Sequence, residues 1–136
     1  MWALTSRFTL SSTPMAEMMY KLFLSGSTNG RQIKVAATSS AGTVIHTTST
    51  TKSHMDEIWL YAHNTHTANV TLTLQYGGTT SPDDNMPTTI APGVGIIQVI
   101  PGLILNSGLI VRAYASTANV VMMSGFVCRN VKASTL

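Results

Sequence analysis

The feature that most constrains the fold of this chain is the alternation of apolar and polar residues in short segments. The clearest example covers residues 69–76, where Val70, Leu72 and Leu74 occupy every second position and threonines stand between them. A period of two places alternate side chains on opposite faces of a β-strand. Similar segments recur at intervals of about ten residues, separated by turns rich in Gly, Pro and Asn, a pattern typical of sandwiches and barrels.

We therefore predict an all-β fold, either an antiparallel β-sandwich or a jelly-roll-like barrel of about eight strands with an extended N-terminal arm. In this interpretation residues 29–130 form the sandwich domain, residues 1–28 the arm or first strand, and residues 131–136 a C-terminal tail. The other expected strands are 31–37, 43–48, 57–63, 88–90, 95–100, 103–105, 109–115 and 119–129.

Three local patterns give finer expectations. Residues 14–24 fit both a helical and an extended pattern, and we favour a strand from Tyr20. The dipeptide Pro101-Gly102 is expected to turn the chain. The sequence Thr-Ala-Asn-Val occurs at residues 67–70 and again at 117–120, and we expect each copy to form the turn and return strand of a hairpin.

The composition indicates a surface suited to association. Charged residues make up 10% of the 136 residues, against roughly 25% in an average soluble protein, and Thr and Ser together make up about a quarter. Few charges mean little electrostatic repulsion between copies. The net charge is +3, but the basic residues are scattered and no aromatic stacking motif accompanies them, which argues against nucleic-acid binding.

The residues that could carry chemistry form no convincing site. The four histidines are expected to be exposed loop residues, and Asp83-Asp84 to serve turn chemistry rather than calcium binding. Asp56 and Glu57 are expected to cap a strand or to pair with a basic residue across an interface. Cys128, the single cysteine, is expected to be a buried inert thiol. We predict no catalytic residues, no metal and no cofactor, because no nucleophile motif or metal-ligand spacing is present.

The N-terminal segment lacks the features of a secretion signal, and no apolar stretch is long enough to span a bilayer. Its large apolar side chains nevertheless require burial somewhere. We expect these side chains either to bind a partner or to cap the domain's own core, and the sequence does not favour one of these two interpretations over the other. The candidate partner-binding residues are Trp2, Leu4, Phe8, Leu10, Met15, Met18 and Met19.

Several segments resemble small virion structural proteins of tailed phages, notably cyanophages and related aquatic phages. These segments are residues 27–35, 44–47, 56–62, 71–78, 81–84, 99–103 and 118–121, which read STNGRQIKV, VIHT, DEIWLYA, TLTLQYGG, SPDD, VIPGL and ANVV. They span most of the chain and mark the fold rather than a catalytic site.

The resemblance implies a β-sandwich virion component without enzymatic activity, in the first place a capsid decoration (cement) protein. Such a protein binds the major capsid protein and copies of itself on the outer capsid surface, as a homo-oligomer for which a trimer is one form. It is assembled in the host cytoplasm and binds no nucleic acid, membrane or small-molecule substrate. The alternative is a tail, neck or fibre-associated structural or receptor-binding module, in which Trp59, Tyr61 and Tyr76 would form a sugar platform if they faced outward. A core position is the simpler expectation for some of these three, because Trp59 lies between Ile58 and Leu60.

Overall fold

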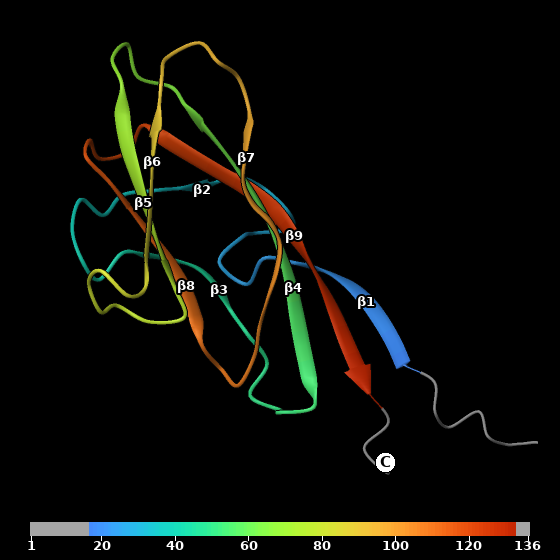
Figure 1. Ribbon diagram of the computed structural model, residues 1–136. Helices are drawn as coiled ribbons and strands as arrows, with labels where there is room; N and C mark the ends of the chain where they lie inside the picture. Colours follow the sequence, from blue (N-terminus) through green and yellow to red (C-terminus); the bar gives the residue numbers. More distant parts are fainter. Residues whose placement is uncertain (1–16, 133–136) are drawn as a thin grey trace, which may run out of the picture.

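The computed structural model describes residues 17–132, which form two antiparallel β-sheets packed face to face (Figure 1). In the described part of the chain no segment forms a helix able to cross a membrane. The strands are β1 (Glu17–Phe23), β2 (Ile33–Lys34), β3 (Thr43–Thr47), β4 (His54–Asn64), β5 (Val70–Tyr76), β6 (Asn85–Ile90), β7 (Ile97–Leu105), β8 (Ile110–Ala115) and β9 (Val121–Lys132).

The strand order is that of a jelly roll. One sheet has the order β1-β9-β4-β7, with β2 also paired to β9, and the other has the order β3-β8-β5-β6. From β2 onward the chain changes sheet at every connection except the one between β5 and β6. This connectivity confirms the predicted all-β sandwich and selects the jelly roll among double-sheet folds.

The core lies between the sheets and follows the alternation in the sequence. Along β4 every second residue from Asp56 to Asn64 is buried, and β5 contributes Val70, Leu72 and Leu74. Removing such side chains from water stabilises the fold by about 2 kcal/mol each. The other fully buried apolar residues include Val35, Ile45, Ile90, Ile100, Val111, Val121, Met123 and Val127.

The ends of the chain differ in part from the expected boundaries. Glu17–Phe23 forms β1 and pairs with β9, so this part of residues 14–24 is a strand and belongs to the sheet (Figure 1). At the other end β9 continues through Lys132, beyond the predicted start of the tail. Residues 1–16, which make up most of the predicted arm, lie outside the described residues.

Two expected turns are wrong. Pro101-Gly102 lies inside β7, where a register shift opposite Ile58 and Trp59 absorbs the extra residue as a β-bulge. The repeated Thr-Ala-Asn-Val segments do not form hairpins, because β4 and β5 lie in different sheets and so do β8 and β9. Each repeat instead carries the chain from one sheet to the other, and only the second has its asparagine, Asn119, in the left-handed region.

Candidate interaction surface

Four apolar side chains lie side by side across the outer face of the five-stranded sheet. Phe23 of β1 pairs with Phe126 of β9, Phe126 pairs with Trp59 of β4, and Trp59 pairs with Pro101 of β7. The two chain neighbours of Trp59 are fully buried in the core, so alternation directs Trp59 and its cross-strand partners outward. We call Phe23, Phe126, Trp59 and Pro101 the apolar row.

Trp59 is the most firmly positioned member of the apolar row. Its ring stacks on Phe126 with the centroids 6.0 Å apart and the planes 10° from parallel. The indole also lies over Gly102, where an added Cβ would approach within 2.6 Å of Trp59 Cζ2. The indole Nε1 donates a hydrogen bond to Glu57 at 3.1 Å. These contacts fix a large apolar surface in one orientation on the outside of the protein.

Opposite charges border the apolar row. The next row on the same face contains Lys21 of β1, Cys128 of β9, Glu57 of β4 and Ile104 of β7. The Lys21 ammonium lies 5.2 Å from the centre of the Phe126 ring, within the range of a cation–π contact. We call these four residues the charged row, and Cys128 within it is half-buried on the outer face rather than in the core as expected.

A mainly apolar cleft opens at the β1 end of the apolar row. It has a volume of about 450 Å³. Phe23, which borders it, is 61% exposed, and Ile104 at the other side of the face is 58% exposed. A cleft of this character accepts a large apolar side chain from a partner. Its lining residues are Lys21, Leu22, Phe23, Gly30, Gly125 and Phe126.

The three aromatic residues considered for a sugar platform are divided between two places. Trp59 and Tyr61 are half-buried on the outer face of β4, and the Tyr61 hydroxyl accepts a hydrogen bond from Gln98 at 3.4 Å. Tyr76 is in the other sheet, where it packs against the core, and burial raises its pKa to about 12. The expectation that some of these three residues have a core position is confirmed by Tyr76, whereas Trp59 and Tyr61 lie on the outer face.

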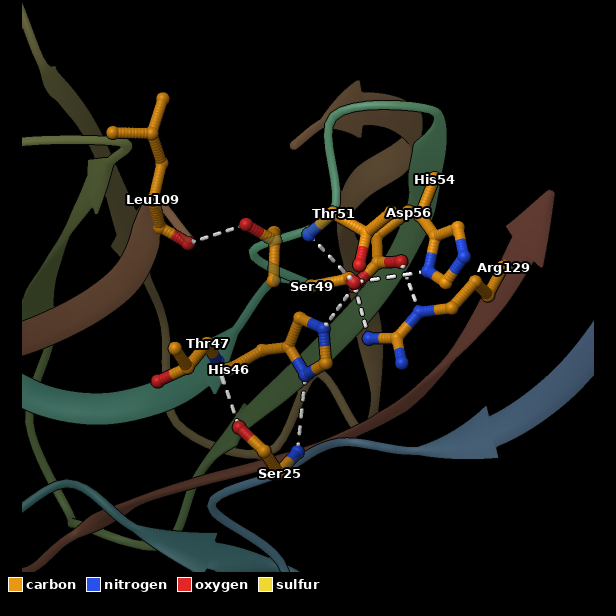
Figure 2. Close-up of polar contacts among 10 residues, drawn as sticks. Ser25, His46, Thr47, Ser49, Thr51, His54, Asp56, Leu109 and Arg129 are labelled. Atoms are coloured by element: carbon orange, nitrogen blue, oxygen red, sulfur yellow. Dashed lines mark hydrogen bonds and ion pairs between the residues drawn. The ribbon is translucent and has the colours of Figure 1, made fainter. Parts of the chain in front are cut away.

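A separate polar cluster lies inside the sandwich (Figure 2). Arg129 of β9 donates hydrogen bonds to both carboxylate oxygens of Asp56 in β4, at 2.6 and 2.8 Å. His46 Nε2 of β3 lies 2.8 Å from Asp56 Oδ2, and His46 Nδ1 accepts a hydrogen bond from the backbone N–H of Ser25 at 3.0 Å. An ionised carboxylate only accepts hydrogen bonds, so the Nε2 atom of His46 carries a proton, whereas Nδ1 accepts a hydrogen bond and carries none. His46 is therefore neutral.

Burial and ion pairing determine the protonation states in this cluster. Burial lowers the pKa of His46, and the opposing effect of the Asp56 carboxylate does not compensate for it. Burial alone would raise the pKa of Asp56, but hydrogen bonds from Arg129 and His46 outweigh it and hold that pKa below its usual value. The cluster therefore consists of a carboxylate, a guanidinium and a neutral imidazole at neutral pH.

The cluster is placed to stabilise the fold rather than to act on a substrate. Asp56 is 0% exposed and His46 is 2% exposed, so neither reaches solvent. His46 lies in a strand, as the expected strand 43–48 placed it, but the expectation that it is exposed was wrong. Asp56 does pair with a basic residue, but with Arg129 of the same chain instead of across an interface. The sequence did contain a signal for the inward position of Asp56: it lies two residues before Ile58 and four before Leu60, and alternate residues of a strand share one face.

The predicted partner-binding residues fall into two groups. Met18 and Met19 are in β1, are 55% and 65% exposed, and point to opposite faces of the strand. Only Met19 shares the outer face with Phe23. The remaining members of the set, Trp2, Leu4, Phe8, Leu10 and Met15, lie outside the described residues.

Metal binding was considered for Asp83-Asp84, and the structure describes these residues within 17–132. No group of three or more His, Cys, Asp or Glu residues converges there in a way that could hold a metal ion. Asp84 accepts a hydrogen bond from the backbone N–H of Thr80 at 2.9 Å, which is turn chemistry as expected.

No protein-family model, curated protein or solved structure matches this chain.

Proposed function

We propose that this chain is a phage virion structural protein, and most specifically a capsid decoration (cement) protein that stabilises the shell through protein–protein contacts. The observation that carries the proposal is the apolar row, a continuous band of Phe23, Phe126, Trp59 and Pro101 on the outside of the described part of the chain. Aromatic side chains held on a surface are typical of protein interfaces.

The fold and composition support the same proposal. Jelly rolls occur in viral capsid domains, although a fold alone does not determine function. Only 10% of the residues are charged, which favours close association between copies. In this proposal the partners are the major capsid protein and copies of the chain itself, on the outer capsid surface of a particle assembled in the host cytoplasm.

The alternative is a tail, neck or fibre-associated module that binds a receptor. It is favoured by Trp59 and Tyr61, which lie on the same outer face of β4. Against it, sugar recognition needs several polar groups around the aromatic platform. The neighbours of Trp59 in the apolar row, Phe126 and Pro101, provide no side-chain hydrogen-bonding groups. The polar groups that flank the two rings are already engaged within the chain, Glu57 with the indole Nε1 and Gln98 with the Tyr61 hydroxyl.

Electron cryomicroscopy of the intact virion tests the proposal. We expect density for the jelly roll on the outer capsid surface, in contact with the major capsid protein. Density confined to the tail, neck or fibre would contradict the capsid assignment and support the alternative. A glycan array probed with the wild-type protein and Tyr61→Ala provides a second test, since specific binding lost in the variant would support receptor recognition.

A further inference from the structure

We infer that the outer face of the five-stranded sheet is the contact between two copies of this chain, packed face to face about a two-fold axis that runs along β9. The inference deepens the proposed function, on which it rests, by naming the occupant of the outer face. It uses the register of β1 and β4, which flank β9 on either side. A two-fold axis along β9 places β1 of one copy opposite β4 of the other.

The charged row is complementary to itself in this arrangement. Lys21 and Glu57 both pair with Cys128, one from each side. The two-fold axis therefore brings Lys21 of each copy opposite Glu57 of the other, so that two ion pairs form by symmetry. Self-complementarity of this kind is what an isologous interface requires.

The apolar row matches in the same way. Phe23 and Trp59 both pair with Phe126, so the axis sets Phe23 opposite Trp59 of the second copy. The cleft beside Phe23 then faces that tryptophan. Packed sheets lie about 10 Å apart with their strands within about 30° of one another, which keeps opposing rows in contact.

Other two-fold axes parallel to the strands leave the charges unmatched. An axis along β4 sets Glu57 against its own copy, and an axis along β1 does the same with Lys21. An axis midway between β9 and β4 sets Lys21 opposite Ile104 and Glu57 opposite Cys128. Within the charged row, an axis along β9 avoids both like charges in contact and buried charges without a partner, which oppose association. The same axis brings Lys132 beside its own copy and Lys34 opposite His63, but both lysines are exposed and lie at the two ends of the face, where water solvates them.

Charge reversal tests the interface through its symmetry. We expect the wild-type protein to sediment as a dimer. Lys21→Glu should weaken dimerisation by about tenfold or more, because the new carboxylate of each copy would face the Glu57 carboxylate of the other. Glu57→Lys should weaken it similarly, and the double variant Lys21→Glu/Glu57→Lys should restore it. Lys52→Glu, the same charge change on an exposed loop lysine between β3 and β4, is the matched control and should leave the dimer intact.

Cross-linking of the unaltered chain gives an independent measurement. Cys128, the only cysteine, lies on β9 and thus beside its own copy across the axis. Because both thiols point into the gap of about 10 Å between the packed sheets, a bifunctional thiol reagent with a short spacer of about 5 Å should convert the wild-type protein to covalent dimers. Lys21→Glu should suppress this product.

Three results would overturn the inference: a monomer at every concentration up to the solubility limit, a trimer, or a double variant that dimerises no better than the single ones. None of them affects where the protein lies on the virion, so the dimer and the capsid assignment are tested separately.

Discussion

Arg129 and the fully buried Asp56 form an ion pair with two hydrogen bonds, one to each carboxylate oxygen, at 2.6 and 2.8 Å. The two residues are direct register partners in β9 and β4. His46 contacts the same carboxylate from β3, which belongs to the other sheet. Through Asp56 the cluster therefore connects both sheets of the sandwich.

The first prediction concerns this ion pair. Arg129→Met should lower the free energy of unfolding by about 3 kcal/mol, because it leaves the buried Asp56 carboxylate without its cationic partner. Urea denaturation monitored by circular dichroism measures the change. The double variant Asp56→Asn/Arg129→Met should lose less than the sum of the single variants, since it removes the unpaired charge. Strictly additive losses would show that the pair is not coupled.

The second prediction is that acid destabilises the protein in two stages. The pKa values of His46 and Asp56 are both lowered in the folded state, so the unfolded chain binds protons more readily at both sites. Stability from such groups is present above the unfolded pKa and is lost as the pH falls toward the folded one. We expect a decline beginning near pH 6.5 from His46 and a further decline below about pH 4 from Asp56.

Unfolding midpoints in urea between neutral pH and pH 3 measure this dependence. His46→Gln should flatten the first stage and leave the second. His63→Gln is the matched control, because His63 lies on the outer face of β4 and makes no side-chain hydrogen bond within residues 17–132. An unchanged first stage in His46→Gln would exclude His46 as its source.

The sequence pattern was sufficient to predict the sandwich and most of its strands, because burial on one face imposes a period of two. The same period also predicts the orientation of Trp59 and Asp56. Ile58 and Leu60 point inward, so Trp59 between them points outward and Asp56, two residues before Ile58, points inward. The expectations were the opposite: the apolar neighbours Ile58 and Leu60 suggested the core for Trp59, and an aspartate suggests the surface. Position in the alternation decided the outcome.

Other features depended on contacts that no local pattern encodes. Arg129 is 73 residues from Asp56 in the chain, and only the pairing of β9 with β4 brings them together. Likewise Pro101-Gly102 has the composition of a turn, yet pairing with β4 holds it within β7 as a bulge. The apolar row could not be found from sequence because its members come from four strands.

The third prediction tests how Trp59 is held. Gly102→Ala should lower the unfolding free energy by about 2 to 4 kcal/mol, because φ is +84° and the new methyl group would meet the indole ring. In a Trp2→Phe background Trp59 is the only tryptophan, so its fluorescence should also shift. Gly93→Ala has a similar φ of +76° with no atom within 4 Å of the new group, and should cost only about 1 to 2 kcal/mol with no spectral shift.

The fourth prediction separates folding from the proposed attachment to the capsid. Deleting residues 1–13 removes Trp2, Leu4, Phe8 and Leu10 but none of the strand pairs, because β1 begins at Glu17. The truncated protein should therefore unfold at nearly the same urea concentration as the full chain. Its binding to capsids stripped of the protein should be lost, since these apolar residues are expected to supply the contact with the capsid.

Co-sedimentation with stripped capsids measures the attachment. Deleting residues 133–136 is the control for loss of a terminal segment, because β9 ends at Lys132, and it should leave binding unchanged. Full attachment by the protein lacking residues 1–13 would rule out the N-terminal segment as the capsid contact. A truncated protein that unfolds much more easily would instead show that Trp2 and Phe8 cap the domain's own core, the other interpretation that the sequence left open.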